Sequence, residues 1–239
     1  RLRTYQDAVV IITGGASGLG FALGEALAQR GAQIVLADLQ LNLAQEKAEQ
    51  IKAKGGRAEA VHLDVYDFFA VNRVIQRTSE SYGRIDYLFN NAGIVVAGEV
   101  EHYELEDWKR VLDVNVQGVV HGVQAVYPVF RAQEFGHIVN VASVAGLFPL
   151  AGLLSYSTSK HAVVGLSTCL RVEAASHGVR VSVLCPGAVD TAIVGGGKYG
   201  KVLKPLPEDI QKALWTRGGP IPPQRFARQA LKGIAKNKA

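Results

Sequence analysis

Two side chains four residues apart, Tyr156 and Lys160, could carry out proton transfer in this chain of 239 residues. Positions i and i+4 of a helix lie on one face, so the spacing predicts that the phenol and the ammonium are neighbours. A phenol with a pKa of about 10 is a poor base at neutral pH, and a nearby ammonium favours its ionised form. The pair therefore predicts a general acid–base site, although plain helix surfaces carry the same spacing.

Ser143 adds a hydroxyl to this candidate site. It follows an apolar run at residues 137–142, which predicts a buried strand. Open α/β sheets bind their ligands beyond the carboxyl ends of the strands. We therefore expect Ser143 to lie where a ligand binds.

A glycine-rich segment, Thr13–Gly20 (TGGASGLG), lies between a predicted strand at 7–12 and a predicted helix at 19–30. Its glycines allow a tight turn and let a pyrophosphate approach backbone N–H groups at a helix N-terminus. The placement predicts a dinucleotide-binding loop. A turn with a purely structural role is the alternative.

Asp38 ends the second predicted strand, 33–37. A carboxylate at this position accepts hydrogen bonds from the adenosine ribose hydroxyls and repels a 2′-phosphate. No lysine or arginine occurs in the glycine-rich loop or beside Asp38, which also favours NAD over NADP. Asp38 could instead cap the following helix, and the two roles are compatible.

The wider pattern predicts the scaffold that positions these residues. Apolar runs alternate with helical segments through six strands, and continuous runs indicate a sheet that is covered on both faces. We predict an α/β fold, a doubly wound parallel sheet (Rossmann fold) in three layers, as a single domain over residues 1–239. Strands are expected at 7–12, 33–37, 57–63, 85–89, 137–142 and 179–184, and helices at 19–30, 41–54, 68–82, 105–133 with a bend near Pro128, 155–176 and 223–236.

Composition and charge exclude several classes of protein. The 26 glycines form no G-x-y repeat, which excludes collagen, and no apolar run approaches the ~20 residues of a membrane span. Residues 198–239 contain ten basic and two acidic residues, a net charge of +8, against +5 for the whole chain. Because no nucleic-acid module is recognised there, we expect a solvated helix face or a subunit contact and no nucleic acid.

Cysteine, histidine and methionine add three expectations. Cys169 and Cys185 lie in apolar runs and are predicted to be buried thiols, which suits the reducing cytoplasm. The six histidines lack metal-ligand spacing, so no metal site is expected. The chain contains no methionine, and a removed leader remains open.

Taken together, these motifs resemble the short-chain dehydrogenase/reductase family in its compact one-domain form, over residues 13–191. The glycine-rich loop and the segments Asn90-Asn91-Ala92-Gly93 and Pro186-Gly187 resemble the family's cofactor-lining segments. The resemblance implies a catalytic tetrad of Asn115, Ser143, Tyr156 and Lys160. It implies that the cofactor-binding residues are Gly14, Ser17, Gly18, Leu19, Gly20, Asp38, Asp64, Val65, Asn91, Ala92, Gly93, Tyr156, Lys160, Pro186, Gly187, Val189 and Thr191.

The resemblance also implies a reaction, the transfer of a hydride between a nicotinamide cofactor and a secondary alcohol or ketone. The Asp38 carboxylate favours NAD over NADP as that cofactor. Tyr156 would pass the proton, and Lys160 would bind the nicotinamide ribose and lower the pKa of Tyr156. Ser143 would orient the substrate oxygen, and Asn115 would hold a water of a proton relay. The implied assembly is a homodimer or homotetramer. A non-catalytic NAD-binding regulatory or scaffold protein on the same fold is the alternative.

Residues 188–222 are rich in glycine and proline and are expected to form a substrate flap. A group of apolar residues is expected to line the substrate pocket, which predicts a mainly apolar substrate. The alternative is that these side chains fill the core or a subunit interface. The residues are Val95, Val96, Val144, Leu147, Phe148, Leu150, Leu153 and Leu154. The basic residues Lys198, Lys201 and Lys204 permit an anionic tail on the substrate. Family members usually continue from the last helix into a seventh strand, which this sequence lacks before Ala239, so the sheet edge and subunit packing stay open.

Overall fold

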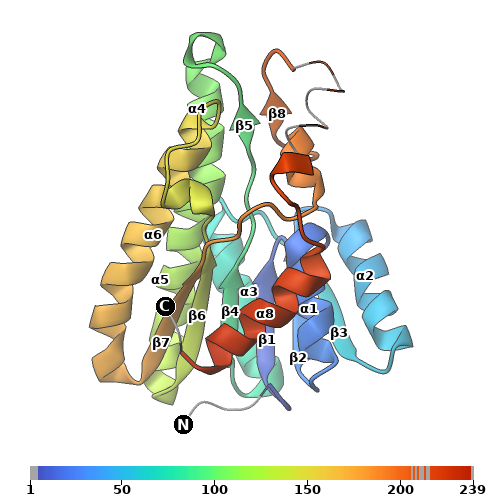
Figure 1. Cartoon of the computed structure of the whole chain (residues 1–239). Helices are drawn as coiled ribbons and strands as arrows, with labels where there is room; N and C mark the ends of the chain where they lie inside the picture. The colour runs from blue at the N-terminus through green and yellow to red at the C-terminus, as the bar shows by residue number, and fades with distance from the viewer. Residues whose placement is uncertain (1–4, 206, 208, 210–212, 214–215, 238–239) are drawn as a thin grey trace.

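A six-stranded parallel sheet forms the centre of the computed structural model, which describes residues 5–205, 207, 209, 213 and 216–237 (Figure 1). The strand order is β3-β2-β1-β4-β6-β7. It reverses between β1 and β4, and doubly wound sheets bind ligands at such a reversal. The strands are β1 (Val9–Thr13), β2 (Gln33–Asp38), β3 (Arg57–His62), β4 (Tyr87–Asn90), β6 (Gly136–Val141) and β7 (Val179–Leu184).

Helices cover both faces of this sheet and complete three layers (Figure 1). One face carries α1 (Gly18–Ala28), α2 (Leu41–Ala53) and α8 (Pro223–Ala235), and the other carries α3 (Phe68–Tyr82), α5 (Gly118–Gln133) and α6 (Leu154–Ala174). Successive residues of a strand point to opposite faces. In β1, Val10 and Ile12 therefore join one core and Ile11 the other. Burial on both faces explains the continuous apolar runs, and the predicted fold class is confirmed.

The helix predicted over 105–133 is interrupted at a place that the sequence analysis did not identify. It consists of α4 (Leu105–Leu112) and α5, joined by a π turn at Asp113–Gln117, whereas α5 continues through Pro128. Asn115 in the π turn accepts a hydrogen bond from the Ile94 N–H (2.8 Å) and donates one to the Ile94 carbonyl (2.9 Å). A tertiary contact therefore holds the interruption, and π turns are frequent at functional sites.

A second, two-stranded parallel sheet lies above the carboxyl ends of the main strands (Figure 1). Its strands are β5 (Val96–Ala97) and β8 (Lys201–Val202), and neither was predicted. In the part of the chain that the structure describes, no strand follows α8, and no helix combines the length and apolar character needed to cross a membrane. The predicted burial of Cys169 is wrong, because this free thiol is exposed on α6, and Cys185 is half-buried.

Candidate active site

The glycine-rich loop turns tightly between β1 and α1. Gly14 and Gly18 have φ angles of +62° and +49°, left-handed values that favour glycine. A Cβ atom on Gly20 would lie 2.2 Å from the Gly14 carbonyl oxygen, so the packing excludes a larger residue. Ser17 is the N-cap residue of α1, and its side chain makes no capping hydrogen bond. The amino end of α1 is therefore suited to an anionic group.

Side chains from β1 and the segment after β4 fix the position of this loop. The Thr13 hydroxyl oxygen accepts hydrogen bonds from the N–H groups of Asn91 (3.0 Å) and Ala92 (3.1 Å). The Asn91 amide donates to the carbonyls of Thr13 (2.9 Å) and Gly14 (3.1 Å). The loop is thus held by the protein's own hydrogen bonds across the reversal of strand order.

Asp38 lies at the carboxyl end of β2 and is only 7% exposed. Its Oδ2 atom accepts a hydrogen bond from the Ala16 N–H (3.0 Å), and its Oδ1 atom accepts one from the Gln40 N–H (2.9 Å). The alternative role as a helix cap is wrong in detail, because the N-cap residue of α2 is Gln40. Since a carboxylate offers about four acceptor sites, Asp38 can position the loop and still accept from a ligand hydroxyl.

Ser143 and Tyr156 meet at the carboxyl end of β6. Ser143 begins a short 3-10 helix, and its hydroxyl oxygen accepts a hydrogen bond from the Ala145 N–H (3.1 Å). Burial raises the pKa of Tyr156, and a hydrogen bond with the Ser143 side chain offsets part of that rise. The phenol is therefore held protonated at neutral pH beside a second hydroxyl.

Lys160 lies one turn along α6, with its Nζ atom 5.4 Å from the centre of the Tyr156 ring. The ammonium donates a hydrogen bond to the Val141 carbonyl (2.9 Å), and burial lowers the pKa of Lys160 to about 8. The expectation that Lys160 lowers the pKa of Tyr156 stays a prediction. The net pKa of Tyr156 is raised because the loss of solvation outweighs the favourable interactions around the phenol.

Asn115 contacts residues on both sides of the site, Ile94 and Ser159. Its side chain is fully buried, and besides its bonds to Ile94 it donates to the Ser159 hydroxyl (3.0 Å), which in turn donates to the Tyr156 carbonyl (2.6 Å). A Cβ atom on Gly93 would lie 3.3 Å from the Asn115 Oδ1 atom and 3.4 Å from the Lys160 Nζ atom. Asn115 thus positions this end of α6, and its role in a water relay stays a prediction.

One cleft of about 650 Å³ brings the predicted residues together. It runs along the carboxyl ends of the strands and does not include Asn115 among its lining residues. The predicted residues that line it are Gly14, Ser17, Gly18, Leu19, Gly20, Asp38, Asp64, Val65, Asn91, Ala92, Gly93, Ser143, Tyr156, Lys160, Pro186, Gly187, Val189 and Thr191.

The apolar residues expected to frame the substrate do not line this cleft. Leu147, Phe148, Leu150 and Leu154 are exposed, whereas Val95 and Val96 are buried. Apolar side chains that do line the cleft come from β6, from the segment after β7 and from the flap, and they include Val141, Val189 and Ile193.

Lining residues that the sequence analysis did not identify include Gln40, Arg110 and Tyr199, and Lys198 was named only as a basic residue of the flap. The Lys198 ammonium donates a hydrogen bond to the Gln40 side-chain oxygen (3.0 Å), and Arg110 donates to the Tyr199 carbonyl (2.7 Å). These pairs are 158 and 89 residues apart in sequence, and no local motif marks them.

One group of possible metal ligands lies outside the cleft among the described residues. Glu99, Glu101 and His102 bring ligand atoms within 4.8 Å of one another. Both glutamates are exposed, and His102 pairs with Glu101 at 3.3 Å. We assign no chemistry to this surface group.

Known proteins share both the sequence pattern and the fold. The family model described as short chain dehydrogenase matches residues 8–198. An uncharacterized oxidoreductase of Staphylococcus saprophyticus is 35% identical over 87% of this chain and 89% of its own length. The 2,5-dichloro-2,5-cyclohexadiene-1,4-diol dehydrogenase LinX of Sphingobium indicum is 37% identical over 77% of this chain and 74% of its own length.

Solved structures of similar sequence share the fold of this chain. A short chain dehydrogenase/reductase from Burkholderia phymatum in complex with NAD is 31% identical, with a TM-score of 0.88 over 99% of this chain and 88% of the other. A putative NAD(P) dependent gluconate 5-dehydrogenase from Beutenbergia cavernae with bound NADP is 30% identical, with a TM-score of 0.83 over 95% and 90% of the two chains. The cleft, the sheet order and these similarities lead to one conclusion: the chain belongs to the short-chain dehydrogenase/reductase family.

Proposed function

We propose that this protein is an NAD-dependent dehydrogenase that interconverts a secondary alcohol and a ketone. One observation carries the proposal: Ser143, Tyr156 and Lys160 line the same cleft as the glycine-rich loop and Asp38. A candidate proton-transfer group, Tyr156, therefore lies in the same cleft as the candidate dinucleotide-binding loop. A protein that only bound NAD would not need the three polar side chains at the other end of the cleft.

The residues of the cleft fit a nicotinamide dinucleotide. Glycines at 14 and 20 let the loop pack closely against Asn91 and its own backbone at the amino end of α1, where backbone N–H groups suit a pyrophosphate, and Asp38 offers acceptor sites for ribose hydroxyls. When bound, the cofactor would supply the hydride acceptor for oxidation and the hydride donor for reduction. The negative charge of Asp38 favours NAD, because a 2′-phosphate beside it would be repelled.

The protein's own residues supply the proton and the positioning. In reduction, the Tyr156 hydroxyl donates its proton to the substrate oxygen; in oxidation, the Tyr156 phenolate removes it. The Ser143 hydroxyl donates a hydrogen bond to that oxygen and orients it. Lys160 binds the nicotinamide ribose with the N–H groups that Val141 does not occupy.

The substrate class is supported by the site and by the names of relatives. LinX acts on a cyclohexadienediol, and the neighbour from Beutenbergia cavernae is a putative gluconate 5-dehydrogenase. The cleft near Ser143 is lined by Val141, Ala142 and Val189. A mainly apolar secondary alcohol or ketone fits these walls best.

Oxidation should become faster as the pH is raised, because Tyr156 must lose its proton before it can act as a base and burial raises its pKa. Reduction by NADH should become slower over the same range, because it needs the protonated phenol. A panel of cyclic and linear secondary alcohols and ketones, followed at the nicotinamide absorbance from about pH 6 to 10, tests both directions. Cofactor binding without turnover on any member of the panel would favour a non-catalytic NAD-binding protein.

We further propose that residues 196–203 form a strap over the cofactor cleft. They belong to the predicted flap at 188–222, of which residues 206, 208, 210–212, 214 and 215 lie outside the described part of the chain. On one side, β8 pairs with β5, and Lys201 forms an ion pair with the buried Asp107 (2.6 Å). On the other side, Lys198 reaches Gln40 at the beginning of α2. The cofactor would have to pass this strap when it enters and leaves.

Lys198→Met should speed the dissociation of NADH by roughly two- to fivefold, because it removes a closing contact worth about 0.5–1 kcal/mol. Stopped-flow fluorescence of bound NADH measures this rate. Lys204→Met, which removes an exposed charge from the same flap, is the matched control and should leave the rate unchanged. Equal rates for the two variants would contradict the strap.

The cellular setting and assembly are proposals of the same kind. Two free thiols, Cys169 and Cys185, suit the reducing cytoplasm. Exposed apolar side chains on α4 and α6, Leu105 and Val172, suit contacts in a homodimer or homotetramer.

A further inference from the structure

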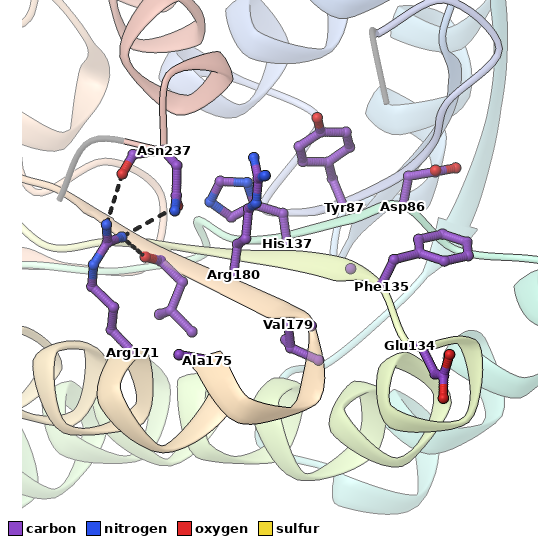
Figure 2. A pocket seen from close by; sticks show the side chains of 13 residues that line it. Asp86, Tyr87, Glu134, Phe135, His137, Arg171, Ala175, Val179, Arg180 and Asn237 are labelled. Atoms are coloured by element: carbon purple, nitrogen blue, oxygen red, sulfur yellow. Dashed lines mark hydrogen bonds between the residues drawn. The ribbon is translucent and has the colours of Figure 1, made fainter. Parts of the chain in front are cut away.

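A second cavity, of about 390 Å³, lies at the amino ends of the central strands, whereas the cofactor cleft lies at their carboxyl ends. Its walls include residues at the amino ends of three strands: Tyr87, the first residue of β4, and His137 and Arg180, the second residues of β6 and β7. Arg171 of α6 and Asn237 close one side of it (Figure 2). The proposed dehydrogenase chemistry uses none of these residues.

Two guanidinium groups, those of Arg180 and Arg171, lie at this cavity. The Arg180 Nη1 atom is buried and has no hydrogen-bond partner among the residues that the structure describes. Among the described residues, Arg171 donates to neutral oxygens, namely the Val181 carbonyl and the carbonyl (2.7 Å) and side-chain oxygen (3.4 Å) of Asn237. Within the described part of the chain, neither arginine forms an ion pair.

Two carboxylates line the cavity, and neither pairs with Arg171 or Arg180. Asp86 forms an ion pair with Arg84 (2.8 Å) and accepts a hydrogen bond from the Val9 N–H (2.9 Å). Glu134 is exposed, and in Figure 2 it lies on the other side of the cavity from Arg171. Among the described residues, no carboxylate therefore offsets the charges of these two guanidinium groups.

Burial, together with the charges of the two arginines, shifts the pKa values of His137 and Arg180. Burial lowers the pKa of His137 to about 3, and the charges of Arg180 and Arg171 act in the same direction. The imidazole is therefore neutral at physiological pH, and its buried Nδ1 atom has no hydrogen-bond partner in the described part of the chain. Burial and the charge of Arg171 also lower the pKa of Arg180.

We propose that this cavity is an anion-binding site for a small phosphate or carboxylate group, held by Arg180 and Arg171. Buried polar atoms in folded proteins are nearly always hydrogen-bonded, so the unpartnered Arg180 Nη1 atom indicates a missing acceptor. A guanidinium offers two parallel N–H groups that match the paired oxygens of a phosphate or carboxylate. The site is independent of the dehydrogenase activity and of the cofactor.

Calorimetric titration of the full chain with inorganic phosphate, and separately with citrate, tests the proposal at constant ionic strength. Saturable binding of either anion is expected, and the anion that binds more tightly identifies phosphate or carboxylate chemistry. Arg180→Gln should weaken this binding at least tenfold. Arg73→Gln, which removes an exposed charge on α3, is the matched control and should leave binding unchanged.

Ala175→Glu provides a second test that leaves both arginines in place. Ala175 is exposed and lines the cavity, so the new carboxylate should compete with the anion and weaken binding to a similar degree (Figure 2). Because it adds a side chain at a surface position, it decides the question if Arg180→Gln fails to fold. Absence of binding to the unmodified chain, or equal binding by both variants and the control, would overturn the proposal. Loss of phosphate binding only when NADH is added would also overturn it, because that result places the phosphate at the glycine-rich loop.

Discussion

Tyr156→Phe is expected to lower turnover by about 10²–10⁴-fold, the usual contribution of a positioned acid or base. The substitution removes only the hydroxyl that would exchange a proton with the substrate oxygen. The ring remains, so the packing of α6 and the position of Lys160 should be preserved. Affinity for NADH, measured by fluorescence titration, should change by less than about threefold, because the phenol hydroxyl is not needed to hold the dinucleotide.

Tyr82→Phe is the matched control for this substitution. It removes a phenol hydroxyl from the carboxyl end of α3, outside the cleft, and should leave turnover and NADH affinity unchanged. Unchanged turnover in Tyr156→Phe would contradict the assignment of Tyr156 as the proton carrier. A parallel loss of NADH affinity would instead place the hydroxyl in cofactor binding.

The second large effect is expected at Asp38, where Asp38→Asn should weaken NADH binding by about 10–100-fold. This range corresponds to about 1.5–3 kcal/mol for a hydrogen bond to a charged acceptor. NADPH binding should improve, because the substitution removes the charge that repels a 2′-phosphate. Adding Leu39→Arg should move the preference further toward NADPH, since Leu39 is partly exposed and lines the cleft beside Asp38.

Two controls separate this effect from a loss of loop structure. Glu46→Gln removes one negative charge from the exposed face of α2 and should change neither affinity. The thermal midpoint of Asp38→Asn reports the lost hydrogen bonds to Ala16 and Gln40. Tighter binding of NADPH than of NADH by the unmodified protein would contradict the role proposed for Asp38.

The central sheet could be predicted from sequence because its signals are local. Continuous apolar runs indicated strands buried on both faces, and successive residues such as Ile11 and Ile12 do enter different cores. The glycine-rich loop and the spacing of Tyr156 and Lys160 are local too, and their residues line one cleft. The π turn at Asp113–Gln117 depends on contacts between Asn115 and Ile94, which are distant in sequence.

The features that sequence could not predict depend on groups brought together by folding. The pairing of β5 with β8 joins two-residue strands that have no periodic signal. The Lys198–Gln40 contact links the flap to α2 across 158 residues. The raised pKa of Tyr156 is similar in origin, because burial dominates it, and burial becomes known only when the surroundings of the phenol are in place.

The central claim is that this chain transfers a hydride between a nicotinamide and a substrate carbon. The most direct measurement uses NADH that carries deuterium at the transferred position, incubated with the protein and a panel of secondary ketones. Mass spectrometry of the products then detects the label. Our account predicts an alcohol with one deuterium on the carbon that bears the hydroxyl, and almost none of it with Tyr156→Phe. NADH binding without labelled alcohol from any ketone would contradict the claim.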